Sequence, residues 1–377
     1  MILKNATIVL HNKLIPNGYL CVKNGVITDI QEGNYDLVTN EEVIDIKGNI
    51  ILPGFIDLHT HGAVGVDFMN ATKSDIEKVA NQFYKEGITT FLLTTLTAPK
   101  EDLLKVAKTV KETIKDVPSL LGIHLEGPYI SLKYKGAQNE LYIRKADIKE
   151  IDELQKESGN LVKYITLAPE KDGSLEIIPE LVKRNIVVSL GHSDSDFDTA
   201  IKAFNLGATN ITHAHNAMSG YHHRNPGLLE AAMYDDNIYC EVISDRVHIC
   251  DDTLKTFYKI IKKDRFMIIT DSLSAKGLDT KEFELMGLPC ETKNGAAYLK
   301  SGPLAGSLLK FNQGVKNLFN LFNLSLIDIA TISSYNQAKS LKLHDRGEIR
   351  VGSLADLVIV DKDFNVLSTY KLGKKVY

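Results

Sequence analysis

Residues 51–62 read ILPGFIDLHTHG, a short apolar run that ends in two histidines. The run is apolar on both faces, which is typical of a buried strand in a parallel sheet. Residues i and i+2 of a strand point to the same side, so His59 and His61 can reach one metal ion together. A His-x-His pair alone is a weak signal, because chance pairs and solvated turns share its spacing. The residues that precede the pair make the whole stretch far more specific.

Further apolar runs follow this stretch and alternate with longer helical patterns, an order that is typical of βαβ units and a parallel sheet. Counting the first, eight runs cover residues 51–59, 89–94, 120–126, 164–168, 186–191, 208–213, 238–244 and 266–271. Eight parallel strands close a barrel. The sequence therefore predicts an α/β fold, a (β/α)8 TIM-like barrel, in preference to a doubly wound sheet.

The segments between these runs carry helix signals. Ser74 and Glu77 have the spacing of a capping box, and Gly87 stands where the helix that they open would end. Similar helical patterns precede later strands, at residues 101–115, 174–185, 197–206, 227–234 and 252–263. Residues 276–303 are rich in glycine and are expected to form an excursion after the eighth strand.

Both ends of the chain are rich in strand and turn patterns. Neither end is long enough to form a stable sheet of its own. We therefore expect residues 1–50 and 347–377 to form one small β-sandwich domain together. It would lie beside a metal-dependent catalytic barrel of residues 51–346.

The composition is that of an ordinary globular protein, with 377 residues of which 44% are hydrophobic and 24% charged. The 44 basic residues against 48 acidic ones give a formal charge of -4, which excludes the basic footprint of a nucleic-acid-binding protein. The four cysteines lie far apart without a CxxC pair, so we expect them to be reduced. No export signal or membrane span is visible, and we expect a cytoplasmic protein with no nucleic-acid or membrane partner.

Three more strand ends each carry a residue of a metal-ligand type: Glu126 in HLEGP, His192 in SLGHSD and His213 in THAHN. A (β/α)8 enzyme builds its site from the C-terminal ends of its strands. A single such His is more often a hydrogen-bonded core residue, but that explanation must hold independently at every strand end. Imidazoles with a carboxylate and no thiolate suit zinc, iron(II) or another borderline divalent ion. His215, two residues after His213, competes with it as a ligand.

Asp271 closes the eighth strand in IITDS. A metal ion lowers the pKa of bound water to about 7, which makes hydroxide available at neutral pH. A carboxylate beside the metal can accept the water proton and later protonate a leaving amine. Asp271 is thus predicted to be the proton shuttle of a hydrolase, although an aspartate at this place can also cap the next helix or touch the metal.

At these residues the sequence resembles the amidohydrolase superfamily, and within it the N-acetylglucosamine-6-phosphate deacetylases. The general superfamily features are PGFIDLHTHG at 53–62 and the glycine-containing segment at 347–358. The motifs similar to the deacetylases are HLEGP at 124–128, GHS at 191–193, TH at 212–213 with NAM at 216–218, and LAGS at 304–307. The resemblance covers the chain essentially end to end.

The resemblance implies that Glu126, His192 and His213 hold the principal metal ion and that Asp271 is the catalytic acid and base. Some family members replace the His-x-His pair by Gln-x-Asn and use a single ion. This sequence keeps His59 and His61 as metal ligands. One ion, or two ions bridged by Glu126, both remain open, with zinc or iron expected.

The resemblance also implies a sugar-phosphate site. It assigns substrate contacts to Ala137, Gln138, Asn216, Ala217, Arg224, His248, Leu304, Ala305 and Gly306. Arg224, whose planar donor fork suits a 6-phosphate, comes from the neighbouring subunit in the family and so implies a homodimer. His248 would donate to the acetamide oxygen and stabilise the oxyanion. Gln138, where some members carry His, and His215, where an aromatic is common, depart from the family pattern.

We therefore expect metal-dependent deacetylation of N-acetyl-D-glucosamine 6-phosphate to D-glucosamine 6-phosphate and acetate, in amino-sugar catabolism or recycling. Metal-activated hydroxide would attack the acetamide carbonyl, with Asp271 as base and then acid. The alternative enzyme is a cyclic-amide hydrolase on the same barrel, which is disfavoured because Ala168 and Pro169 stand where a carboxylated lysine would end strand four. An inactive scaffold protein is disfavoured because every ligand position is filled.

Overall fold

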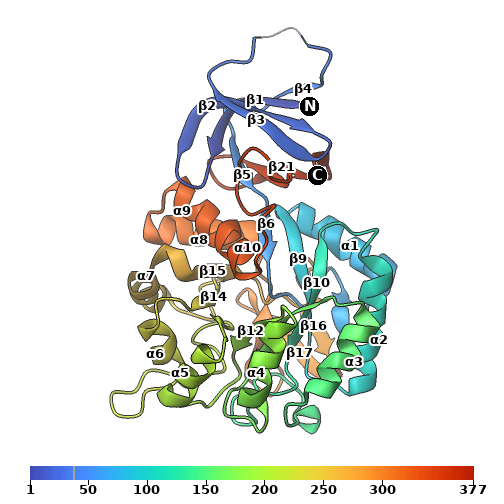
Figure 1. The fold of residues 1–377 in the computed structure, drawn as a ribbon, viewed down its shortest axis with the longest axis vertical. Coiled ribbons are helices and arrows are strands. Elements are labelled where there is room, and N and C mark those ends of the chain that lie inside the picture. The colour runs from blue at the N-terminus through green and yellow to red at the C-terminus, as the bar shows by residue number, and fades with distance from the viewer. Residues whose placement is uncertain (37–38) are drawn as a thin grey trace.

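The computed structural model describes residues 1–36 and 39–377. Its centre is an eight-stranded parallel sheet that curls into a barrel, with helices around it (Figure 1). In chain order the strands are β6 (Phe55–Asp57), β9 (Ile88–Thr95), β10 (Leu120–Glu126), β11 (Val162–Leu167), β12 (Val187–Leu190), β13 (Asn210–Ile211), β14 (Tyr239–Ile243) and β15 (Phe266–Ile269). Each strand pairs with the next one along the chain. The predicted (β/α)8 barrel is confirmed.

Backbone contacts beyond the strand ends join the first strand to the last. The N–H of Asp271 donates to the carbonyl of His59 at 2.8 Å, and the N–H of His61 donates to the carbonyl of Ser272 at the same distance. Between these bonds, Thr60 and Ser272 form a parallel bridge. The barrel is therefore closed at its C-terminal rim by the same residues that the sequence marks as functional.

Amphipathic helices cover the outside of the barrel, and the apolar face of each packs on the strands. They are α1 (Lys73–Tyr84), α2 (Lys100–Thr113), α3 (Ile148–Ser158), α4 (Ser174–Lys183), α5 (Phe197–Asn205), α6 (Leu228–Tyr234), α7 (Asp251–Arg265), α8 (Phe311–Phe322), α9 (Leu326–Ala330) and α10 (Asn336–Ser340). Two short 3-10 turns are η1 (Phe68–Asn70) and η2 (Glu140–Tyr142), while η3 (Thr331–Tyr335) is a π-helical segment that joins α9 to α10. None of the helices in the described part of the chain combines the length and apolar character needed to cross a bilayer.

The capping box of α1 lies two residues earlier than predicted. Thr72 accepts a hydrogen bond from the N–H of Asp75, and the Asp75 carboxylate accepts one from the N–H of Thr72. The prediction of Ser74 and Glu77 was wrong because both pairs have the same spacing, while only Thr72 has the extended backbone of an N-cap. Gly87 does follow the helix end, with a φ of 84°.

Both chain termini lie in a second sheet (Figure 1). Its strands are β1 (Ile2–Val9), β2 (Leu14–Lys23), β3 (Val26–Glu32), β4 (Val43–Asp45), β5 (Ile50–Pro53), β20 (Leu357–Val360), β21 (Val366–Lys371) and β22 (Lys374–Lys375). Strand β20 pairs antiparallel with β5, so the two ends of the chain share one hydrogen-bonded sheet. The β-sandwich description and the boundaries at 50 and 347 stay a prediction.

The apolar run at residues 51–59 is divided between the two sheets. Gly54 separates β5, in the terminal sheet, from β6 in the barrel. A Cβ atom on Gly54 would stand 2.3 Å from the side chain of Thr89, so only glycine fits where the chain passes between the sheets. The prediction of a single strand here was wrong, because the pattern of apolar residues does not show which sheet a strand joins.

The excursion after the eighth strand forms an antiparallel sheet of its own. Its strands are β16 (Glu282–Leu285), β17 (Leu288–Lys293), β18 (Ala296–Leu299) and β19 (Leu304–Ser307), and a small hairpin of β7 (Gly62–Ala63) and β8 (Val66–Asp67) follows the first barrel strand. Ser307 of β19 bridges to Ser272, just beyond β15. The excursion thus returns its last strand to the rim of the barrel.

A fully buried ion pair fixes the segment that follows β15. The Nζ of Lys276 lies 3.0 Å from Oε2 of Glu86 and 4.4 Å from the ring centre of Phe83. The same carboxylate oxygen accepts the N–H of Phe311 at 3.1 Å. One buried carboxylate therefore joins the end of α1, the segment after β15 and the start of α8.

We expect Lys276→Met to lower the free energy of unfolding by about 3–5 kcal/mol, because it leaves the Glu86 carboxylate buried without its partner. Urea denaturation followed by circular dichroism measures the change. The matched control is Lys105→Met, which removes an exposed pair with Asp102 and should match wild type within error. Equal effects of the two substitutions would contradict the prediction.

Candidate metal centre

Six ligand-type side chains converge at the C-terminal rim of the barrel, each at or just beyond the end of a strand. They form two groups. The first group contains His59, His61 and Asp271, and the second contains Glu126, His192 and His213. All six side chains are buried. Every metal ligand that the sequence predicted is therefore brought to one place, with Asp271 beside them.

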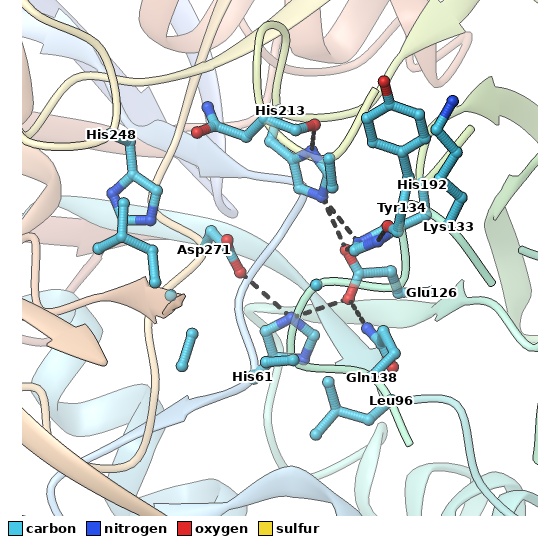
Figure 2. A pocket seen from close by; sticks show the side chains of 17 residues that line it. His61, Leu96, Glu126, Lys133, Tyr134, Gln138, His192, His213, His248 and Asp271 are labelled. Carbon is cyan, nitrogen blue, oxygen red and sulfur yellow. Dashed lines mark hydrogen bonds and ion pairs between the residues drawn. The ribbon is translucent and has the colours of Figure 1, made fainter. Parts of the chain in front are cut away.

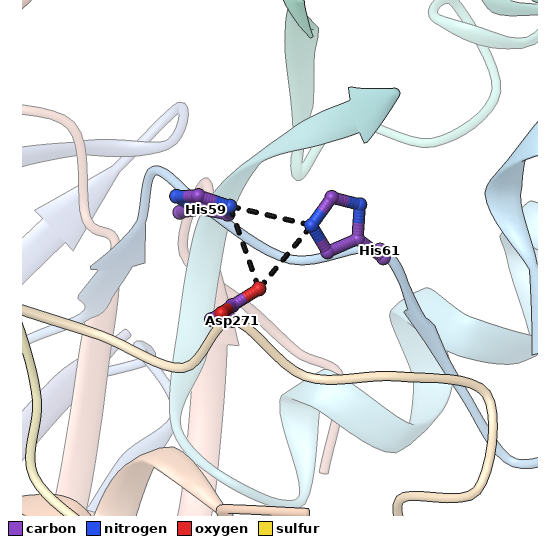
Figure 3. Close-up of side chains that lie close together, drawn as sticks. All are labelled: His59, His61 and Asp271. Atoms are coloured by element: carbon purple, nitrogen blue, oxygen red, sulfur yellow. Dashed lines mark hydrogen bonds and ion pairs between the residues drawn. The ribbon is translucent and has the colours of Figure 1, made fainter. Parts of the chain in front are cut away.

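The first group joins the beginning of the barrel to its end (Figure 3). The two Nε2 atoms of His59 and His61 lie 3.3 Å apart. Oδ1 of Asp271 lies 3.2 Å from Nε2 of His61 and 3.5 Å from Nε2 of His59. The two histidines, just beyond the first strand, thus direct both rings to one side, facing the carboxylate that follows the eighth strand.

The second group surrounds Oε1 of Glu126 (Figure 2). This oxygen lies 3.1 Å from Nε2 of His213 and 3.3 Å from Nε2 of His192. The two imidazole Nε2 atoms are 3.1 Å apart. Ligands about 2.0–2.1 Å from a tetrahedral zinc ion are about 3.3 Å from one another, so these spacings suit a shared cation.

The hydrogen bonds behind the rings leave the facing nitrogen atoms free to bind metal. Nδ1 of His192 donates to the carbonyl of Tyr134 at 2.8 Å, and Nδ1 of His213 donates to the carbonyl of Asn216 at 3.1 Å. In the neutral ring, Nε2 then keeps its lone pair. Two lone pairs and a carboxylate oxygen of Glu126 therefore face one another, an arrangement that a divalent cation stabilises.

Glu126 connects the two groups. Its Oε1 lies 3.1 Å from Nε2 of His59, and its Oε2 lies 3.3 Å from Nε2 of His61. Burial raises the pKa of Glu126, but the neighbouring imidazoles outweigh it and hold the pKa well below its usual range. The ionised carboxylate can therefore contact both groups at once, which accommodates one ion or a bridged pair.

Three of the six residues have a backbone conformation that L-residues rarely adopt. The φ angles are 49° for His192, 32° for His213 and 48° for Asp271. Each residue is the second one after the end of its strand, where the chain turns out of the sheet. Such strain costs on the order of 1–3 kcal/mol per residue and is typical of functional sites, where the surrounding structure imposes it.

The structure separates His213 from its rival His215. The ring of His215 packs edge-on against Phe257, with 4.7 Å between ring centres, and belongs to neither ligand group in the described part of the chain. Burial lowers its pKa. Because His213 lies in the left-handed region, the alternation of a regular strand is lost, and His215 is directed away from the centre.

A cavity of about 300 Å³ is lined by five of the six ligand-type side chains, all except His59 (Figure 2). Of the predicted substrate contacts, it is lined by Ala137, Gln138, Asn216, Ala217, His248, Leu304, Ala305 and Gly306. The ring of His248 is held by Asp245, whose Oδ2 lies 2.7 Å from Nδ1. Arg224 is not among the lining residues; it is exposed, and its guanidinium contacts Nε2 of His223 at 2.7 Å.

Gln138 lines the cavity but already has two protein partners. Its Nε2 donates to Oε2 of Glu126 at 2.5 Å, and its Oε1 accepts the N–H of Thr97 at 2.7 Å. The side chain is buried. One amide N–H remains for a substrate, so a sugar contact by Gln138 would be added to its contact with Glu126.

Sequence reasoning missed several lining residues and one buried partner. Leu96, Lys133, Tyr134 and Gly136 line the cavity, and Glu241 lies behind His59. The four lining residues come from loops without periodicity. Lys133, which pairs with Asp194 at 2.8 Å, is the only lysine or arginine among the cavity's lining residues in the described structure.

Residues 50–376 match the model of the amidohydrolase family. The chain belongs to this family. The family is metal-dependent, in agreement with the two groups of ligand-type side chains. The chain is 37% identical to an N-acetylglucosamine-6-phosphate deacetylase of Bacillus subtilis, over 99% of this chain and 96% of the relative.

Two further proteins are similar to this chain over most of their length. The crystal structure of N-acetylglucosamine-6-phosphate deacetylase from Thermotoga maritima superposes with a TM-score of 0.91 at 36% identity, covering 100% of this chain and 99% of that one. An N-acetylgalactosamine-6-phosphate deacetylase of Escherichia coli O157:H7 is 30% identical, over 88% of this chain and 89% of the relative. The similarity therefore covers both the barrel and the sheet formed by the two chain termini.

We expect Gln138→Leu to weaken metal binding about 10–100-fold, because it removes the hydrogen bond that orients Glu126. Dialysis against graded chelator concentrations, followed by elemental analysis, measures the loss. The exposed Gln313→Leu on α8 is the control and should retain metal like wild type. Unchanged retention in Gln138→Leu would show that Gln138 does not support the centre.

Proposed function

We propose that this protein is a metal-dependent hydrolase of a linear amide C–N bond, which converts N-acetyl-D-glucosamine 6-phosphate to D-glucosamine 6-phosphate and acetate. The observation that carries the proposal is that both ligand groups, Asp271 and His248 meet at one cavity. Deacetylases of this kind are similar to the chain over nearly its full length. The reaction would belong to amino-sugar catabolism or recycling, in the cytoplasm.

The ligands proposed for the metal are His59, His61, Glu126, His192 and His213. Nitrogen and oxygen donors without a thiolate suit zinc or iron, bound as one ion or as two ions that share Glu126. When bound, a divalent cation supplies Lewis acidity, which makes water nucleophilic near pH 7 and polarises the amide carbonyl.

Asp271 is placed to move the protons of the reaction. Burial raises its pKa, but His59 and His61 outweigh that effect, so the pKa lies below its ordinary value and the carboxylate is ionised. It lines the cavity, where it can take a proton from the attacking water. The same proton can then be passed to the departing amine, because breaking the C–N bond leaves a basic nitrogen.

His248 and strand β19 are proposed to hold the acetamide and the sugar. Asp245 accepts the Nδ1–H of His248 and so fixes the ring, whose Nε2–H, present in the doubly protonated imidazolium, can donate to the carbonyl oxygen as negative charge develops on it. A Cβ on Gly306 would stand 3.0 Å from the carbonyl of Asp271, so glycine allows β19 to approach the catalytic residue closely. Ala137, Asn216, Ala217, Leu304 and Ala305 complete the proposed substrate contacts.

The 6-phosphate requires a cation, and in the described part of one chain the cavity has a lysine or arginine only at Lys133. We propose that Arg224 of a neighbouring subunit provides a bidentate contact, in a homodimer with shared sites. The exposed position of Arg224, outside its own chain's cavity, supports this arrangement. The strictness for phosphate then depends on the dimer.

The cyclic-amide alternative lacks the usual bridging group. Strand β11 ends at Leu167 and is followed by Ala168, so the described rim offers no lysine there for carboxylation. Glu126, from the end of β10, has the bridging position instead. A linear amide in an open cavity is therefore favoured.

We expect purified protein to release acetate from N-acetylglucosamine 6-phosphate, and to lose this activity after chelation. The unphosphorylated sugar and the 4-epimeric N-acetylgalactosamine 6-phosphate are the comparison substrates. Asp271→Asn should lower kcat about 10²–10⁴-fold at unchanged metal content, because the amide cannot accept the proton. Acetate release that survives chelation, or an Asp271→Asn variant with wild-type kcat, would overturn the proposal.

Mixing two variants, one impaired in phosphate binding and one in catalysis, tests the shared site at substrate concentrations below KM. We expect Arg224→Met to raise KM for the phosphorylated sugar and to leave turnover of the unphosphorylated sugar unchanged. Co-refolded Arg224→Met and Asp271→Asn chains should recover about a quarter of the wild-type activity, since each mixed dimer then contains one complete site. No recovery, with mixed dimers present, would place Arg224 in its own chain's site or outside both.

A further inference from the structure

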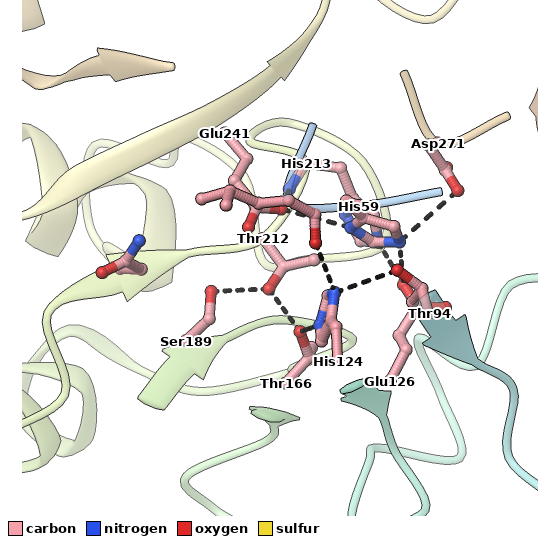
Figure 4. Close-up of polar contacts among 12 residues, drawn as sticks. His59, Thr94, His124, Glu126, Thr166, Ser189, Thr212, His213, Glu241 and Asp271 are labelled. Atoms are coloured by element: carbon pink, nitrogen blue, oxygen red, sulfur yellow. Dashed lines mark hydrogen bonds and ion pairs between the residues drawn. The ribbon is translucent and has the colours of Figure 1, made fainter. Parts of the chain in front are cut away.

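A buried carboxylate lies directly behind the metal centre, on the side away from the cavity. Glu241 is on β14, points into the barrel and is fully buried. Its Oε2 lies 3.2 Å from Nδ1 of His59 (Figure 4), and its Oε1 accepts the hydroxyl of Tyr164 at 2.6 Å. The backbone N–H of His213 adds a longer contact to Oε2, at 3.4 Å.

Glu241 distinguishes His59 from the other three ligand imidazoles. His192 and His213 direct Nδ1 to backbone carbonyls, while Nδ1 of His61 has no hydrogen-bond partner in the described structure. Among the described residues, only His59 of the four has its Nδ1 within hydrogen-bond distance of a carboxylate. A carboxylate in this position fixes the tautomer with Nε2 toward the metal and makes that nitrogen a stronger donor.

The charge of Glu241 also needs compensation. Transferring a carboxylate into a barrel interior is costly unless a positive charge lies nearby. No lysine or arginine forms an ion pair with Glu241 among the described residues; its one basic partner there is the imidazole of His59. Tyr164 donates a hydrogen bond but brings no charge, since burial, and after it Glu241, raise the pKa of the phenol well above its ordinary value.

We propose that Glu241 is a positioning residue that acts through His59 to strengthen cation binding at the group of His59, His61 and Asp271, with Tyr164 holding the carboxylate in place. A cation on Nε2 of His59 supplies the positive charge that the buried carboxylate requires. The group of Glu126, His192 and His213 does not depend on Glu241 in this way. The inference rests on the metal dependence of the proposed function.

Glu241→Gln is the sharpest test, because the amide keeps the size of the side chain and an oxygen for His59 but removes the charge. Metal-free protein is titrated with Co²⁺, and the visible absorption of bound cobalt reports each binding step. We expect the step at the His59 group to weaken about 10–100-fold while the other step is unchanged. This readout needs no substrate, so it stays informative if the deacetylase proposal fails.

Two further variants separate positioning from general stability. Thr212→Val is the matched control, because Thr212 is buried in the same interior and bonds to Ser189 and Thr166 but not to His59. It should leave both cobalt steps unchanged. Tyr164→Phe keeps the charge of Glu241 and should weaken only the His59 step, less than Glu241→Gln does. If Glu241→Gln does not fold, Tyr164→Phe carries the test.

The proposal is overturned if Glu241→Gln binds cobalt like wild type, or if it and Thr212→Val weaken both steps equally. A single cobalt step whose affinity and spectrum are the same in wild type and Glu241→Gln overturns it as well. Where Tyr164→Phe carries the test, a His59 step like that of wild type has the same consequence.

Discussion

The buried carboxylate of Glu126 is the constraint on which the rest of the centre depends. Four imidazoles lie within 3.3 Å of its two oxygens, and the side chain is almost fully removed from water. A buried carboxylate is stable only when hydrogen-bond donors point toward its oxygens and a positive charge lies nearby. The fixed rings, the contact from Gln138 and the affinity for a divalent cation all follow from this requirement.

The barrel meets the requirement because its strands end together. Closure of the first strand on the eighth brings His59 and Asp271 side by side, and the same backbone bond that completes the barrel, from Asp271 to His59, sets their separation. The left-handed conformations of His192, His213 and Asp271 turn the side chains toward the centre. The packing of the strands and helices beneath the site compensates for the free-energy cost of these strained backbone conformations.

The supporting contacts are divided between two faces of the centre. On the cavity side, Gln138 holds Glu126 and Asp245 holds His248, so the groups proposed to meet substrate are fixed before it binds. On the interior side, Glu241 contacts Nδ1 of the buried His59, and the hydroxyl of Tyr164 donates a hydrogen bond to Glu241. The cavity between one chain's loops nevertheless offers little positive charge, which is why the proposed phosphate contact comes from a second subunit.

The sequence alone determined the strand order, the barrel and the ligand-type residues. A buried parallel strand appears in the sequence as a short apolar run, and the first polar residue after the run marks the end of the strand. His59, Glu126, His192, His213 and Asp271 could be named on that basis. Only the tertiary structure placed Gln138 against Glu126 and Glu241 behind His59. Glu241 and His59 are 182 positions apart in the chain, and Gln138 lies in an irregular loop, so neither contact leaves a periodic pattern in the sequence.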